Sequence, residues 1–199
     1  QTCALPICTV SFLENSGFDI GTVNTVGLTA STSVTLNSTG TVTQSNLIST
    51  PSLLLLGTNG IYTLTNTSNA IAILAANTGN VSFLENSGFA IGVVGATNGI
   101  TATTLTLSST GAVTQAQALT VTNLELLGAG GTYTLTNTGN AITTLAGNTG
   151  TVSFVDNGGF DIGTVNTVGL TASTSVTLNS TGTVTQSNLI STPSLLLLG

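Results

Sequence analysis

The chain has 199 residues, of which six are acidic and none is Lys, Arg or His, so its formal net charge is −6 at pH 7. Because phosphate groups are bound by cations, this composition excludes nucleic acids and anionic membrane surfaces as electrostatic partners. It also removes imidazole metal ligands and the usual general bases. We therefore expect a protein that is not an enzyme, with no cofactor and no metal site.

The remaining composition is typical of a β-rich chain. The mean hydropathy is +0.52 and only 3% of residues are charged, whereas disordered chains combine low hydrophobicity with high charge. The 42 Thr and 24 Gly residues favour short strands separated by tight turns. Apolar runs such as Leu53–Leu56 are much shorter than the roughly 20 residues of a membrane-spanning helix, so we expect no membrane insertion.

The first eight residues differ from the rest of the chain. They contain both cysteines, Cys3 and Cys8, and one of the three prolines. The segment 1–7 can be encoded by a DNA sequence that resembles the end of a widely used sequencing adaptor. We interpret 1–8 as a non-native leader and expect 9–199 to form a single domain.

A long repeat of constant length organises that domain. The segment that begins at Thr9 recurs at Asn80 and again, after the same interval, at Thr151. The copies are therefore 9–79, 80–150 and a partial 151–199. The third copy agrees with the first at 46 of 49 positions, whereas the second agrees with the first at 40 of 71. This pattern indicates either a higher-order period of two copies or a duplication of the first. Exact periodicity predicts a stacked array rather than a closed globule.

Alternating segments within each copy predict short strands. The period of two places a set of apolar residues on one face, toward a core: Tyr62, Leu64, Ile71, Ile73, Val81 and Phe83. Corners such as Asn59-Gly60 and Asn98-Gly99 contain residues that tolerate left-handed backbone. We predict an all-β fold, a parallel and right-handed β-solenoid of about eight coils with about three coils in each repeat.

Two segments, Leu126–Asn140 and Leu145–Phe154, resemble filamentous-haemagglutinin-type exoproteins. These are very large bacterial surface adhesins that are secreted by the two-partner route. The resemblance implies a right-handed β-helix stalk, localisation outside or on the bacterial cell, and contact with host or neighbouring-cell surface molecules through the parent protein. The amino-terminal secretion domain and any terminal cap are missing, as expected of an internal stalk fragment. An autotransporter passenger is the alternative parent.

The acidic residues are candidates for chemistry. Glu14, Glu85 and Asp156 occupy the same repeat position, so we expect them three coils and about 14 Å apart. A catalytic carboxylate pair needs a separation of about 5–10 Å. We therefore interpret these acids as solvated corner charges. Asp19 and Asp161 follow five residues later, and a catalytic pair is the alternative interpretation.

The aromatic residues recur at fixed positions. We predict that they form structural core rungs, in which identical side chains stack along the solenoid, at Phe12, Phe18, Phe83, Phe89, Phe154, Phe160, Tyr62 and Tyr133. Stacking platforms for sugars are the alternative. Because each coil buries its apolar face only against its neighbours, we also expect end-to-end self-association of the chain.

Two functions remain at this stage. The first is a structural stalk or adhesive segment, which provides reach, stiffness and resistance to proteases. The second is an ice-binding solenoid, because segments such as Thr39–Thr43 and Thr134–Thr138 carry alternate Thr residues. An ice-binding surface needs such rows in adjacent coils on one face. We expect the Thr segments to lie on different coil sides, which favours the stalk.

Overall fold

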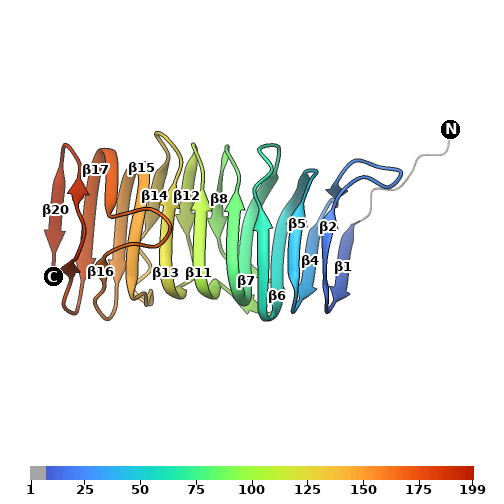
Figure 1. Ribbon diagram of the computed structural model, residues 1–199, viewed down its shortest axis with the longest axis horizontal. Coiled ribbons are helices and arrows are strands. Elements are labelled where there is room, and N and C mark those ends of the chain that lie inside the picture. The colour runs from blue at the N-terminus through green and yellow to red at the C-terminus, as the bar shows by residue number, and fades with distance from the viewer. Residues whose placement is uncertain (1–7) are drawn as a thin grey trace.

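The computed structural model describes residues 8–199, which form one rod-shaped β-solenoid of about nine turns (Figure 1). Within this range there is no helix, and hence none that could cross a membrane. Strands of successive turns pair in parallel and build one 18-stranded sheet around a continuous core. The predicted all-β parallel solenoid is therefore confirmed, with close to the expected number of coils. Most of the predicted leader, residues 1–7, lies outside the described residues.

Residues 8–199 form twenty strands, given in chain order. They are β1 (Thr9–Glu14), β2 (Gly17–Ile20), β3 (Leu28–Thr29), β4 (Ser33–Ser38), β5 (Thr41–Gln44), β6 (Ile48–Leu64), β7 (Ala70–Leu84), β8 (Gly88–Ile91), β9 (Val93–Val94), β10 (Thr97–Asn98), β11 (Ile100–Ser108), β12 (Ala112–Gln115), β13 (Leu119–Leu127), β14 (Thr132–Leu135), β15 (Thr144–Asp156), β16 (Asp161–Ile162), β17 (Leu170–Ser180), β18 (Thr185–Gln186), β19 (Ile190–Ser191) and β20 (Leu195–Leu198). Only β9 and β10 lie outside the main sheet, as an antiparallel pair.

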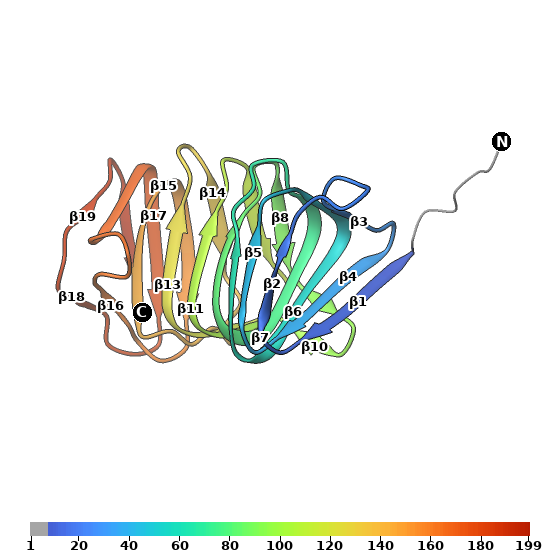
Figure 2. The ribbon, with the colours of Figure 1, turned by 45° about the vertical axis from the view of Figure 1, so that its right-hand side comes forward.

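One coil consists of three short strands joined by corners. The second coil, for example, contains β4, β5 and the first residues of β6. Figure 2 shows β1, β4 and β6 side by side on one side of the rod, with β2 and β5 on the next. Gly88 opens the second strand of its copy with a φ of 98°, and a Cβ there would lie 2.3 Å from the Ala112 carbonyl oxygen. Only glycine allows the coils to approach so closely at this corner.

Each copy of the repeat begins one side further around the rod than the copy before it. Thr9 pairs with Ser33, which belongs to the same side in the next coil. Asn80, the equivalent of Thr9, pairs with Ile61 and through it continues the side of β2 and β5. Thr151 pairs with Thr132 and continues the side of β8 and β12. One full copy thus covers three coils and one additional side.

The core columns therefore mix residue types. Phe12 stacks on Leu36, Leu36 on Leu55, and Leu55 on Ala76. Phe83 belongs to another side, where it stacks on Leu64 and Leu107. The predicted stacking of identical aromatic side chains is wrong for this reason: the equivalent residues lie on different sides of the rod. Side chains of different size thus share a column and fill the core together.

Two predictions, one on a core residue and one on the domain boundary, need correction. Ile73, which we expected in the core, faces outward, because the alternation shifts between Ile71 and Leu74. At the amino-terminal end, the carbonyl of Cys8 accepts hydrogen bonds from the backbone N–H groups of Thr32 at 2.7 Å and Ser33 at 3.2 Å. Cys8 thus belongs to the first coil and pairs with the second, one residue before the expected domain boundary.

Candidate functional site

Two of the three corner carboxylates, Glu85 and Asp156, are buried caps and not the solvated charges that we expected. Glu85 is 1% exposed and accepts hydrogen bonds from the Ser87 hydroxyl at 2.5 Å and the Gly88 N–H at 2.6 Å. The Ser87 N–H donates a third bond at 3.1 Å. The Glu side chain thus occupies the bend and satisfies backbone donors that would otherwise be buried without a partner. The interpretation as a solvated corner charge is wrong for Glu85.

Asp156 and Glu14 perform the same task in the other copies. Asp156 is fully buried and accepts from the N–H groups of Gly158 and Gly159, and its second oxygen accepts from Ile142 in the preceding coil. Glu14, in the first coil, is only half-buried, and hydrogen bonds from Ser16 lower its pKa. Because of the rotation between copies, Glu14, Glu85 and Asp156 lie on different sides and form no row.

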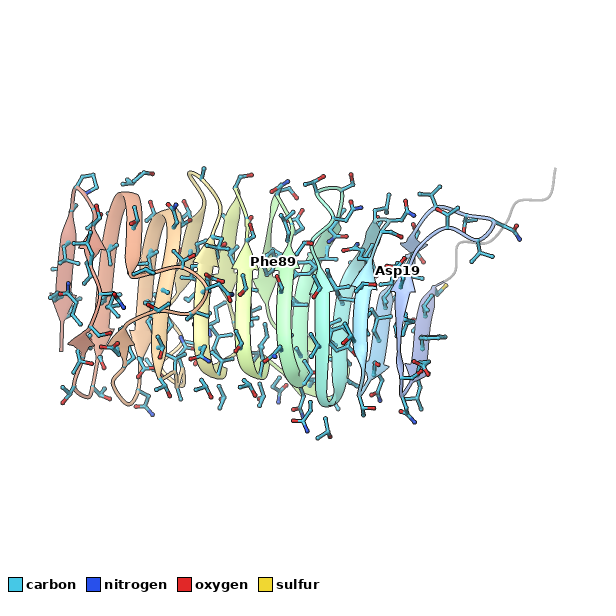
Figure 3. All side chains as sticks on the ribbon, viewed as in Figure 1. Asp19 and Phe89 are labelled. Atoms are coloured by element: carbon cyan, nitrogen blue, oxygen red, sulfur yellow. The ribbon has the colours of Figure 1, made fainter. Side chains whose placement is uncertain are left out.

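Asp19 and Asp161 connect adjacent coils. Asp161 accepts hydrogen bonds from the hydroxyl groups of Ser187 at 2.5 Å and Thr185 at 2.7 Å, one coil further on. These bonds lower the pKa of Asp161, with Ser187 as the main cause. Asp19, labelled near the amino-terminal end in Figure 3, does the same with Ser45 and Thr43. These two copies of one inter-coil link lie near opposite ends of the rod and form no catalytic pair.

Glu125 is the acid that the sequence did not single out. It is 1% exposed, and it binds a loop that follows it by about forty residues. Its oxygens accept from the N–H of Thr167 at 2.7 Å, the side-chain amide of Asn166 at 2.8 Å and the hydroxyl of Thr106 at 2.8 Å. Burial alone would raise the pKa of Glu125, but the bonds from Asn166, Thr167 and Thr106 more than offset it and hold the pKa below its usual range.

The phenylalanine residues form pairs across the corners. Phe83 and Phe89 are buried, with ring centroids 5.3 Å apart in an edge-to-face arrangement. The equivalent pair of Phe154 and Phe160 is also buried, at 5.4 Å. Figure 3 labels Phe89 midway along the rod, inside the coils. In the first coil Phe12 is 44% exposed and Phe18 is half-buried, because no described coil lies beyond them. An exposed platform for sugars is thus absent from the described coils beyond the first.

The two tyrosines are fully buried and bind corner carbonyls. The Tyr62 hydroxyl lies 2.5 Å from the Leu56 carbonyl oxygen and accepts a bond from the Ser38 N–H at 3.0 Å. Desolvation raises the pKa of Tyr62 to about 12. Tyr133 is placed in the same way and its pKa is also raised by burial. The sequence predicted both as core residues, Tyr62 by period-two alternation and Tyr133 as an aromatic core rung, but it did not indicate the hydrogen bonds.

Two buried asparagines make a further inter-coil network that the sequence analysis missed. The Asn140 side-chain amide donates to the carbonyls of Leu135 and Val155, and its oxygen accepts from the Leu119 N–H. It also binds the side chain of Gln115. Asn69 repeats this arrangement with Gln44. The recurrence of Asn with Gln in both full copies was the available signal, since a buried amide is retained where it bridges strands.

The outward hydroxyl groups align more than we expected. Thr134 pairs with Thr114 and with Ser153, so outward residues of three successive coils share one row. A second row, two residues away, contains Ala112, Thr132, Thr151 and Ser175. The segments Thr39–Thr43 and Thr134–Thr138 do lie on different sides, as expected, because Thr41 pairs with Gly17 and Ile61. Hydroxyl groups of adjacent coils nevertheless align on the side of β14. The rows are about 7 Å apart, and neighbours within a row about 4.8 Å.

Within residues 8–199 no three metal-ligating side chains gather at one place. The hollows at the two ends of the rod expose the core itself. The carboxyl-terminal hollow is lined by residues such as Leu178, Val184 and Leu197. The amino-terminal hollow is lined by residues such as Phe12 and Val23. No family model, no curated protein and no solved structure matches the chain.

Proposed function

We propose that the chain is a stalk segment of a large secreted bacterial surface protein, with a mechanical and not a catalytic task. One observation carries this proposal. Each of the six carboxylates accepts hydrogen bonds from a corner, from the adjacent coil or from a loop. Asp19, Glu125, Asp156 and Asp161 therefore link neighbouring turns, whereas Glu14 and Glu85 brace the corners of their own turns. Such an arrangement favours stiffness along the rod, where a catalytic group would need open access to a substrate.

Secretion and surface localisation rest on the likeness to haemagglutinin-type repeats carried by Leu126–Asn140 and Leu145–Phe154. The composition agrees with service outside the cell, because a chain without Lys or Arg offers trypsin no cleavage site. Contacts with host or neighbouring cells would be made by the parent protein. An antibody raised against the chain should label intact producing cells or their medium. Labelling that requires lysis would contradict the surface assignment.

The mechanical proposal is tested by shape and by force. Small-angle scattering from the full chain should report a rod whose cross-section is that of one solenoid coil. Pulling the ends apart in a single-molecule experiment should produce stepwise loss of coils, because each coil depends only on its neighbours. A flexible chain at low force, or scattering from a compact globule, would overturn the stalk proposal.

A second candidate, an ice-binding surface, is favoured by the aligned hydroxyl rows. Thr132 and Thr134, Thr151 and Ser153, and Ser175 and Thr177 repeat over three coils on one side. The test is inhibition of ice recrystallisation by the full chain, together with the Thr151→Tyr variant in the middle of the rows. Thr63→Tyr, on another side, is the matched control. Inhibition that only Thr151→Tyr abolishes would favour this function, and no inhibition would exclude it.

A further inference from the structure

Three equivalent loops leave the solenoid, one from each copy: loop 21–27, loop 92–99 and loop 163–169. Each is closed by a hydrogen bond between its flanking glycines, from the last N–H to the first carbonyl. The N–H···O distances are 3.1 Å for Gly27 to Gly21, 2.9 Å for Gly99 to Gly92 and 2.8 Å for Gly169 to Gly163. The closing glycines share a left-handed backbone, with φ of 70°, 69° and 73°. The loop shape is therefore intrinsic to the sequence.

The loop of the second copy lies on an apolar surface of the first. Val94 packs on Leu54 and Ala75 in a small cluster outside the main core, with Ile73 at its edge. We call Leu54 and Ile73 the apolar floor. Gly95 leaves room there, since a Cβ on it would just contact the Leu54 side chain at 3.9 Å. This contact explains why Ile73 faces outward and yet remains half-buried.

The loop of the third copy lies on a polar surface of the second. Figure 1 shows this orange loop folded back across the neighbouring strands. The Glu125 carboxylate beneath it binds the Asn166 amide and the Thr167 N–H, and Thr106 donates from below. A Cβ on Gly163 would meet Thr144 at 2.9 Å, so Thr144 also lies under the loop. We call Glu125 and Thr144 the polar floor.

The two floors are the same two repeat positions. Glu125 occupies in the second copy the position that Leu54 occupies in the first, and Thr144 likewise corresponds to Ile73. Loop and floor thus change together: an apolar loop with Val94 lies on the apolar floor, and a polar loop with Asn166 lies on the polar floor. An exchange of partners would bury the Glu125 carboxylate without its loop donors or cover a leucine with amides. Either mismatch removes interactions that a buried group needs.

We propose that loop and floor form an ordering lock, which specifies the type of copy that stacks on each end of another. The first and third copies share one loop sequence and carry Leu at the floor position, as Leu54 and Leu196. The second copy carries the other loop and Glu125. Packing then requires that copies with Leu at the floor position alternate with copies that carry Glu there. Loop 21–27, identical to loop 163–169, is built to cover a coil that presents a carboxylate.

This proposal also defines the partner that the amino-terminal end accepts. In loop 21–27 both Asn24 and Thr25 are exposed, and Val23 is 94% exposed. A coil with Glu at the position of Glu125 would accept hydrogen bonds from Asn24 and Thr25, as Glu125 does from Asn166 and Thr167. The carboxyl-terminal coil of a second copy of the chain presents Leu196 instead, which does not. The inference holds whether the rod is a stalk or an ice-binding surface.

The lock is tested by exchanging its two halves in the full chain. One variant converts the floor, with Glu125→Leu and Thr144→Ile. The other replaces loop 163–169 by the segment 92–99, and a third combines both changes. We expect each half-exchange to accelerate amide hydrogen exchange in the loop by about tenfold or more, as a buried polar group loses its partners. The combined variant should return to within about threefold of the parent. Accelerations that simply add would overturn the proposal.

Loop 21–27 is the matched control, because it has the same sequence as loop 163–169 but covers no floor residue in the described chain. Asn166→Ala should accelerate exchange at the Thr167 amide, whereas Asn24→Ala should leave loop 21–27 unchanged, because no described residue binds Asn24. Exchange in the central coils reports whether each variant is folded. Equal effects of Asn166→Ala and Asn24→Ala would mean that the side chain acts within its own loop, and the lock would be rejected.

Discussion

The Tyr133 hydroxyl lies 2.9 Å from the Leu107 carbonyl oxygen, although the two residues are 26 positions apart in the chain. The same hydroxyl is 2.6 Å from the carbonyl of Leu127. One buried phenol thus contacts the ends of two strands in consecutive coils. The Leu127 carbonyl also accepts from the Ser109 N–H at 3.0 Å, so the hydroxyl adds a polar contact between the two coils at this shielded corner.

Replacement of this hydroxyl should be costly. Tyr133→Phe keeps the ring in the core but leaves buried carbonyls with weaker partners, so we expect a loss of about 1–3 kcal/mol in the free energy of unfolding. Chemical denaturation measures it. Phe154→Leu, which changes only apolar volume nearby, separates the hydrogen bond from packing. An unchanged midpoint for Tyr133→Phe would show that the carbonyls find other donors.

High pH should destabilise the rod through its tyrosines. Burial raises the pKa of Tyr62 to about 12, whereas an unfolded tyrosine ionises near pH 10. The stabilisation is therefore complete below about pH 10 and is lost as the pH rises through the folded pKa. We expect phenolate absorbance to appear together with loss of β-structure. Phenolate formation near pH 10 in a chain that stays folded would contradict the buried position of Tyr62.

Low pH should destabilise the rod through the acids. Asp161 and Glu125 have lowered pKa values in the folded chain, so their stabilisation is complete above the unfolded pKa of about 4 and is lost as the pH falls through the folded pKa. The melting temperature should decrease from pH 5 toward pH 2. The Asp161→Asn and Glu125→Gln variants should show a flatter dependence. A melting temperature that rises on acidification would reverse the assigned direction of both pKa shifts.

Glu85→Gln should cost more than Glu14→Gln, although the two residues are equivalent in sequence. Gln keeps one acceptor but opposes the remaining donors with its own NH₂ group, so we expect a loss of about 1–3 kcal/mol at the buried site. At the half-buried Glu14 water can replace the lost bond, and the change should be small. Thermal melting of both variants decides this. Equal losses would mean that burial is not the cause.

Phe83→Ala should be more damaging than either glutamate change. Truncation of a buried Phe typically costs about 3–5 kcal/mol. Phe12→Ala, at the exposed first coil, should cost much less. Because coils interact only with their neighbours, the Phe83 variant should open near its own coil, and limited chymotrypsin digestion should cut there first. Cleavage at the chain ends only, in the Phe83→Ala variant, would show that the defect is not local.

The sequence was sufficient for the fold but not for the arrangement of the copies. Period-two alternation and Asn-Gly corners predict strands and turns locally, and exact repetition predicts stacking. The side on which each copy begins depends on the sum of all coil lengths. In the structure these vary, since Thr9 pairs with a residue 24 positions later and Ser33 with one 19 positions later. Small differences accumulate, and they moved Phe83 away from the column of Phe12.

The interpretation of the acids failed for a different reason. An acidic residue in a turn is usually solvated, and nothing in the composition shows that the Glu85 side chain bends back over its own corner. Glu125 was overlooked because its loop partners, Asn166 and Thr167, are more than forty positions away, in a segment without apolar periodicity. The available signal was the comparison of copies. The change from Leu54 to Glu125 coincides with the change between their loops, which is the pattern expected of residues in contact.

Exposed leucines at the last strand should cause association. Leu195–Leu198 are 46–61% exposed along an unpaired strand edge. We expect concentration-dependent oligomers in analytical ultracentrifugation, and Leu197→Lys should reduce them because a charged edge resists pairing. Val168→Lys, equally exposed but on a loop, is the control. A monomer at all concentrations would contradict association through the β20 edges of two chains.

The rotation of one side per copy has a consequence for how such a rod is seen from outside. A feature carried once in each copy does not form a stripe but winds around the rod, facing three directions in turn. Since the two copy types also alternate, in a longer array the same type would return to the same direction only at every sixth copy. Bound molecules of any size would then be spaced widely along each flank and would not crowd one another.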